Sequence, residues 1–101
     1  DYVQPSVDLS REVCEGGGFK AGPKLRFVKD DLTRSAFKGE FDVVFDKGTM
    51  DAFLLGSGHT TEMYTGGVHG MLKAGGLLFL ASCNNTADEI KGFFEGDCWA
   101  F

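Results

Sequence analysis

Three short apolar segments of the chain are each followed directly by polar residues that can do chemistry. Asp30 and Asp31 come after residues 25–28, Asp46 comes after residues 41–45, and Cys83 and Asn84 come after residues 77–82. Carboxylates accept hydrogen bonds and favour nearby positive charge, and an amide both donates and accepts. If the segments are parallel strands, these side chains lie beyond the carboxyl ends, where open α/β sheets bind ligands. The sequence therefore nominates them as a polar binding site.

The segments themselves have the composition of strands. Residues 41–45 read FDVVF and residues 77–82 read LLFLAS, nearly continuous apolar runs that are typical of strands covered on both faces. Residues 25–28 form a third short strand in this interpretation, and residues 98–101 are expected to begin a further one.

Helical patterns separate these strands. The predicted helices span residues 5–15, 61–73 and 86–95. Thr86 and Glu89 have the spacing of a capping box at the start of the third helix, and Gly75 with Gly76 is expected to end the second. Strands that alternate with helices pair in parallel through right-handed crossovers. The predicted class is α/β, a Rossmann-like parallel sheet with helices on both faces.

Composition narrows the possible functions. The 101 residues allow one small domain, and 43% hydrophobic residues with ten Phe suffice for a packed core. A net charge of −5 argues against nucleic acid and anionic membranes as partners. The apolar runs are far shorter than the ~20 residues of a membrane helix. Three widely spaced cysteines favour a reducing compartment, so we expect a soluble, cytoplasmic protein.

Two sequence stretches carry a family resemblance. Residues 46–52 read DKGTMDA, and Ser82-Cys83-Asn84 is followed by Thr86 and Glu89. In this combination the chain resembles the class I S-adenosylmethionine-dependent methyltransferases, and within them the lysine methyltransferases that act on translation elongation factor 1-alpha. The resemblance implies S-adenosylmethionine as cofactor, a protein-lysine N-methyltransferase activity, elongation factor 1-alpha as the protein substrate, and a monomer when the protein is complete.

The resemblance also implies cofactor contacts. Asp1 would accept hydrogen bonds from the ribose hydroxyls, and Tyr2 would lie close to the adenosine. Asp31 would meet the adenine amino group, with the backbone N–H of Leu32 beside it, while Asp30 is a competing candidate for this contact.

The remaining roles implied by the resemblance lie after the strand 41–45. Asp46 would favour the positive sulfonium and act as the catalytic residue. Thr49, Asp51 and Asn84 would guide the substrate lysine. In-line methyl transfer mainly requires alignment of a neutral amine and exclusion of water, so the protein needs no nucleophile of its own.

The chain departs from the family pattern at its ends. The Gly-rich loop after the family's first strand, that strand itself and the C-terminal strands have no counterpart in residues 1–101, and residue 1 is Asp rather than Met. We therefore expect a partial methyltransferase domain that binds cofactor poorly alone. Two other functions stay open: a catalytically silent Rossmann-like binding module, and a small-molecule methyltransferase of the same fold.

Structural interpretations compete with these assignments. An acid after a strand is often only a helix cap or turn former, which applies singly to Asp30, Asp31 and Asp46. His59 and His69 lie ten positions apart without a partner at ligand spacing, so no metal site is predicted.

Overall fold

The computed structural model describes residues 4–17, 25–96 and 98–101. The chain divides into two compact units, and the boundary between them in the sequence lies between Ala36 and Phe37. Each unit is described by itself. Among the described residues, no helix has both the length and the apolar character needed to cross a membrane.

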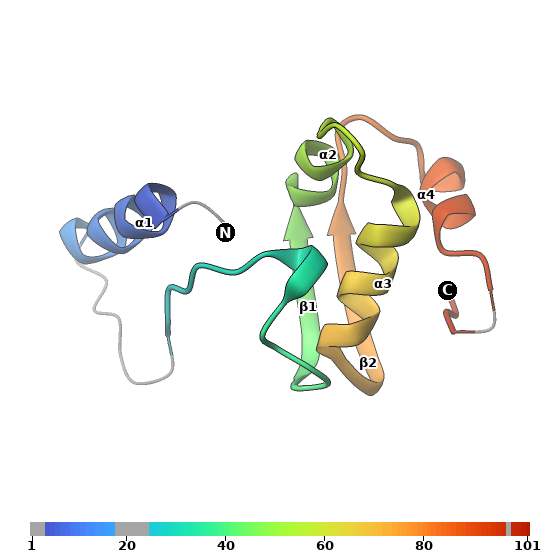
Figure 1. Ribbon diagram of the computed structural model, residues 1–101, viewed down its shortest axis with the longest axis horizontal. Helices are drawn as coiled ribbons and strands as arrows, with labels where there is room; N and C mark the ends of the chain where they lie inside the picture. Colours follow the sequence, from blue (N-terminus) through green and yellow to red (C-terminus); the bar gives the residue numbers. More distant parts are fainter. Residues whose placement is uncertain (1–3, 18–24, 97) are drawn as a thin grey trace. The chain divides into compact units, whose positions relative to one another are not determined.

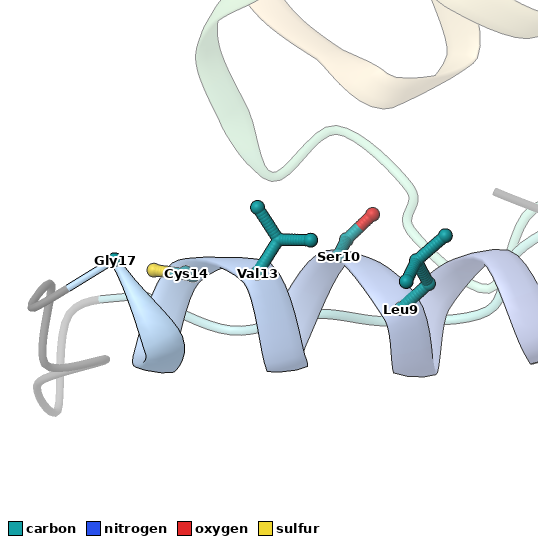
Figure 2. Close-up of a pocket in the computed structure, with 5 residues that line it drawn as sticks. All are labelled: Leu9, Ser10, Val13, Cys14 and Gly17. Carbon is teal, nitrogen blue, oxygen red and sulfur yellow. The ribbon is translucent and has the colours of Figure 1, made fainter.

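The first unit contains the predicted N-terminal helix. α1 spans Gln4–Gly16 and buries Val7. Leu9 and Val13 are exposed and line an open hollow along the helix together with Ser10, Cys14 and Gly17 (Figure 2). The helix predicted at residues 5–15 is therefore confirmed, and the side of it that lines the hollow is mostly apolar.

The strand predicted at residues 25–28 is wrong. These residues have no regular structure, and the chain continues into a short 3₁₀ helix, η1, at Leu32–Arg34. A strand requires a hydrogen-bonded neighbour, and within the described residues only β1 and β2 pair with each other. The apolar composition of the segment cannot supply that neighbour.

The second unit is built on two parallel strands, β1 at Phe41–Lys47 and β2 at Leu72–Ala81. Both arrows point the same way in Figure 1, and the register pairs Phe45 with Phe79 and Lys47 with Ala81. The strands predicted at residues 41–45 and 77–82 are thus confirmed, and so is the parallel α/β arrangement.

Gly75 and Gly76 do not end the preceding helix as predicted. They lie inside β2, where the register jumps from the pair Phe41–Leu72 to the pair Val43–Leu77. Gly75 has a φ of +76°, and a side chain at Gly76 would come within 2.9 Å of the Lys73 carbonyl oxygen. The glycines therefore allow an irregularity in the strand, because no other residue fits that backbone path easily.

Three helices complete the second unit: α2 at Thr49–Leu54, α3 at Thr61–Met71 and α4 at Ala87–Phe93. The side chain of Thr60 caps α3, and Thr86 with Glu89 forms the predicted capping box of α4. α2 was not predicted from the sequence, and it lies at the end toward which both strands point (Figure 1). Its six residues are too few for a visible helical period.

The core of the second unit covers one face of the sheet. It contains Met50 of α2, Tyr64 and Val68 of α3, and Phe94 after α4. Phe94 packs edge-on against Trp99, with ring centroids 4.8 Å apart. The strand expected to begin at residues 98–101 is absent; these described residues form a turn and irregular chain.

Within the second unit, the opposite face of the sheet is exposed, so the prediction of helices on both faces stays a prediction for that face. Phe45 and Phe79 stack on each other there with centroids 6.5 Å apart, and their exposed fractions are 74% and 52%. Val43 and Leu77, which pair two residues earlier along the strands and lie on the same face, are exposed too. Within the second unit as described, no helix packs on this face, so the helices of this unit cover only one side of its sheet.

Candidate functional site

Asp46 lies at the carboxyl end of β1 with its side chain turned into the core. Its residue is only 5% exposed. One carboxylate oxygen accepts a hydrogen bond from the backbone N–H of Thr49 (2.8 Å), and the other accepts from the N–H of Met50 (3.0 Å) and from the hydroxyl of Tyr64. A buried carboxylate is tolerated only with such donors. Asp46 thereby joins β1, the first turn of α2 and the middle of α3.

Two features of the local sequence bring Asp46 into this position. Strand alternation places Asp46 on the same face as Val44, which is the face covered by helices. Gly48 then turns the chain with a φ of +83°, a left-handed conformation that favours glycine. Its N–H donates to the Ala81 carbonyl oxygen (3.3 Å), which ties the end of β1 to the end of β2.

Tyr64 is a site residue that sequence reasoning missed. It is 1% exposed, and its pKa is raised because burial and the neighbouring Asp46 carboxylate both disfavour the phenolate. The hydroxyl therefore stays protonated and donates to Asp46. The sequence did contain a signal for this role. Tyr64 lies four positions before Val68 on the apolar side of a predicted helix, and a buried tyrosine hydroxyl needs a polar partner.

Asp51 in the first turn of α2 reaches across to the loop that follows β2. Its carboxylate accepts hydrogen bonds from the Ser82 hydroxyl (2.5 Å), the Cys83 N–H (2.9 Å) and the Asn85 side-chain amide (3.3 Å). These bonds, that of Ser82 foremost, lower the pKa of the Asp51 carboxyl below its ordinary value. Asp51 is 9% exposed and remains ionised at neutral pH.

Ser82 organises the loop beyond it. Its hydroxyl oxygen accepts from the backbone N–H of Asn84 (3.3 Å) and of Asn85 (3.2 Å) while its proton goes to Asp51. The side chain of Asn84 is exposed, and so is that of Thr49. The structure therefore places Asp46, Thr49, Asp51 and Asn84 at the carboxyl end of the strands. The predicted sheet nominated Asp46 and Asn84 for this edge, and the family resemblance added Thr49 and Asp51.

Three of the residues predicted to contact the cofactor lie in the first unit: Asp30, Asp31 and Leu32. Asp31 caps η1 by accepting hydrogen bonds from the N–H (2.9 Å) and the hydroxyl (2.7 Å) of Thr33, and its side chain is 43% exposed. Leu32 is the first residue of η1. Asp30 bonds instead to the Ser35 hydroxyl (2.5 Å) and the Ala36 N–H (3.2 Å).

The other two predicted cofactor residues, Asp1 and Tyr2, lie outside the described residues. The roles assigned to the acids of the first unit and to those of the strand ends stay predictions.

The geometry at the strand ends is suited to orienting groups. Both carboxylates, of Asp46 and Asp51, are held by protein donors, so their negative charges are fixed in place. Within the described ranges, no three His, Cys, Asp or Glu side chains gather as metal ligands would. The hollow along α1 is lined by none of the predicted site residues.

Comparison with curated proteins identifies relatives along nearly the whole chain. It is 34% identical to "Protein-lysine N-methyltransferase EFM4" of Saccharomyces cerevisiae over 96% of its own length and 44% of the relative's. It is 32% identical to human "EEF1A lysine methyltransferase 2" over 94% of its length and 41% of the relative's. A Schizosaccharomyces pombe protein named efm4 is 28% identical over 93% of the chain.

The chain thus spans less than half the length of the curated relatives that it matches. No protein-family model and no solved structure matches it. Over nearly its whole length the chain is thus similar to curated proteins named as lysine methyltransferases, and its parallel α/β arrangement agrees with a partial Rossmann-like fold.

Proposed function

We propose that the chain serves the transfer of a methyl group from S-adenosylmethionine to a lysine of translation elongation factor 1-alpha. The observation that carries the proposal is the similarity to proteins named as lysine methyltransferases, two of them as acting on EEF1A, over 93–96% of the chain. Two acids support it: Asp46 at the carboxyl end of β1 and Asp51 in the first turn of α2. Open α/β sheets bind ligands at the carboxyl ends of their strands.

The residues present are compatible with the cofactor that methyltransferases use. S-adenosylmethionine would supply an electrophilic methyl group on a positive sulfonium. Asp31 offers a partly exposed carboxylate, which suits an amino group or a hydroxyl. The buried charge of Asp46 would favour a positive group nearby, although its oxygens already accept three hydrogen bonds from the protein.

The chain's own contribution to such a transfer is orientation and control of the amine's proton. A substrate lysine has a reference pKa of ~10.4 and must be neutral to attack. Thr49 and Asn84 are exposed at the strand ends, where a side chain can contact the amine and help to align it. The role of Asp46 as the catalytic residue remains part of the proposal.

A cytoplasmic location also belongs to the proposal. Cys83 and Cys98 are free thiols in the structure. Free thiols at exposed positions suit a reducing compartment.

The test is transfer of a tritiated methyl group to purified elongation factor 1-alpha by the full natural chain, with cofactor binding measured by isothermal titration. Asp46→Asn removes the charge and keeps the shape of the side chain. Asp42→Ala is the matched control, because Asp42 is an exposed acid on the same strand that pairs with Lys73 at 3.5 Å.

We expect labelling by the wild type and by Asp42→Ala, and weaker cofactor binding with slower labelling by Asp46→Asn. Cofactor binding without labelling of elongation factor 1-alpha contradicts the substrate and favours a small-molecule methyltransferase. Absence of both cofactor binding and labelling contradicts the enzyme and favours a silent binding module.

A further inference from the structure

The strand-end loop after β2 is held by a network that spans a long stretch of sequence. Asp51 and Ser82 lie 31 positions apart and are joined by a hydrogen bond of 2.5 Å. The same carboxylate accepts from the N–H of Cys83 and the amide of Asn85. Two oxygens of Asp51 thus serve three donors of one loop.

These hydrogen bonds distinguish Asp51 from Thr49 and Asn84, the other two residues predicted to guide the substrate. Its carboxylate is buried and used internally, whereas the side chains of Thr49 and Asn84 are exposed and have no hydrogen-bond partner within the described part of the chain. Asn84 sits in the middle of the loop that the network fixes, because its backbone N–H donates to the Ser82 hydroxyl oxygen. An amide oxygen is a suitable acceptor for the N–H groups of a lysine amine.

We propose that Asp51 is a positioning residue, which acts through Ser82 to hold the loop 83–85 so that Asn84 contacts the substrate lysine. This inference rests on the proposed methyl transfer. It changes the role of Asp51 from a direct guide of the substrate to the anchor of the residue that guides it. A second hydrogen bond between residues far apart in the sequence supports the loop. The N–H of Gly48 donates to the Ala81 carbonyl oxygen, which joins the two strand ends next to the loop.

The test compares Asp51→Ala, Asp51→Asn and Asn84→Ala in the full natural chain. For each we measure kcat and KM for the protein substrate, and the Kd of S-adenosylmethionine by isothermal titration. Asp51→Ala and Asn84→Ala are each expected to raise KM or lower kcat for the protein substrate about tenfold, because displaced positioning groups cost rates of this order or more. The cofactor Kd is expected to stay within about twofold.

Two further variants distinguish positioning from general loss of structure. Asp51→Asn keeps an oxygen for Ser82 or Cys83 and is expected to recover part of the activity. The double variant Asp51→Ala with Asn84→Ala is expected to be no worse than either single variant, because both remove the same contact. Asp42→Ala, an exposed acid outside the network, is the control and is expected to match the wild type.

The outcomes separate this inference from the proposed function. Suppose that the wild type labels its substrate. If Asp51→Ala then weakens cofactor binding as much as substrate turnover, Asp51 is only structural and the inference is wrong. The same holds if the effects of Asp51→Ala and Asn84→Ala on activity add fully in the double variant. If Asp51→Ala equals the wild type, the inference is also wrong. A wild type that binds cofactor and labels nothing overturns the proposed function, and the inference with it.

Discussion

Two pairs of acids in this chain look alike in sequence and differ in what they hold. Asp30 and Asp31 follow a short apolar segment, as Asp46 follows another with Asp51 five positions later. In the first unit, Asp30 bonds to groups five and six positions away and Asp31 bonds to Thr33 two positions away. In the second unit, Asp46 reaches Tyr64 over 18 positions, and Asp51 reaches Ser82 over 31.

The difference shows that the position of an acid after an apolar run does not determine its role. A local bond shapes a turn and can form with little help from the rest of the fold. A bond across 18 or 31 positions requires that strands and helices already be in place, and it stabilises that arrangement in return. Removal of an acid should therefore cost the second unit much more than the first.

The largest effect is expected from Asp46→Ala. It leaves the hydroxyl of Tyr64 and the N–H of Met50 buried without their acceptor. Loss of hydrogen bonds to a buried charged group costs about 3 kcal/mol of unfolding free energy. Urea unfolding followed by the fluorescence of Trp99, the single tryptophan, measures this because Trp99 packs on Phe94 in the core of the second unit.

Tyr64→Phe sharpens the same prediction, because it removes one of the three donors and keeps the ring in the core. We expect a loss of about 1 kcal/mol, and a double variant with Asp46→Ala that costs clearly less than the sum. Asp42→Ala should change the unfolding free energy by less than about 0.5 kcal/mol. Equal losses for Asp42→Ala and Asp46→Ala would contradict the importance of the buried network.

The same contrast explains which parts of the fold could be predicted. The strands FDVVF and LLFLAS, the helix at residues 5–15 and the Thr86 capping box rest on local patterns, and the structure confirms them. The strand predicted at residues 25–28, which the structure does not form, depends on a neighbour that no local pattern contains. The predicted sheet edge was enough to nominate Asp46 and Asn84, whereas Thr49 and Asp51 came only from the family resemblance.

The partners of these acids could not be predicted from the sequence. Tyr64 and Ser82 are identified as partners only when α3 and β2 fold against α2, because nothing in the spacing of 18 or 31 residues is characteristic of a hydrogen bond. The bonds of Asp46 to the backbone of Thr49 and Met50 are local, and they depend on the turn between β1 and α2. Gly48 makes the turn that brings Thr49 and Met50 back to the carboxylate.

A smaller, pH-dependent effect is expected from Asp51. Because its pKa is lowered from the ordinary 3.8, the folded state favours the ionised carboxylate. That stabilisation is present above this ordinary value and is lost as the pH falls through the lowered folded-state pKa. Asp51→Asn should therefore reduce the loss of stability as the pH falls below that ordinary value, measured as the urea midpoint of Trp99 fluorescence.

Asp51 is not the one acid that can make stability depend on pH in this range. The pKa of Glu62 is also lowered, chiefly by a hydrogen bond from its own backbone N–H at the start of α3, so the pH profile of the wild type must be compared with that of Asp51→Asn. Wild type and Asp51→Asn share Glu62, so the difference between their pH profiles isolates Asp51. Parallel profiles of the two proteins would show that the hydrogen bonds from Ser82 and Cys83 do not favour the ionised form.

The smallest effect is expected from Asp31→Ala in the first unit. The substitution removes the side-chain cap of η1, whose loss typically costs about 1 kcal/mol locally. Amide hydrogen exchange at Thr33, which donates to Asp31 at 2.9 Å, should accelerate, and Asp31→Ser should restore most of the protection because serine also caps. The Trp99 unfolding transition should move by less than about 0.5 kcal/mol. A shift of that transition as large as the one caused by Asp46→Ala would mean that the acids of the two units stabilise the same cooperative structure, and the contrast between local and long-range acids would then be wrong.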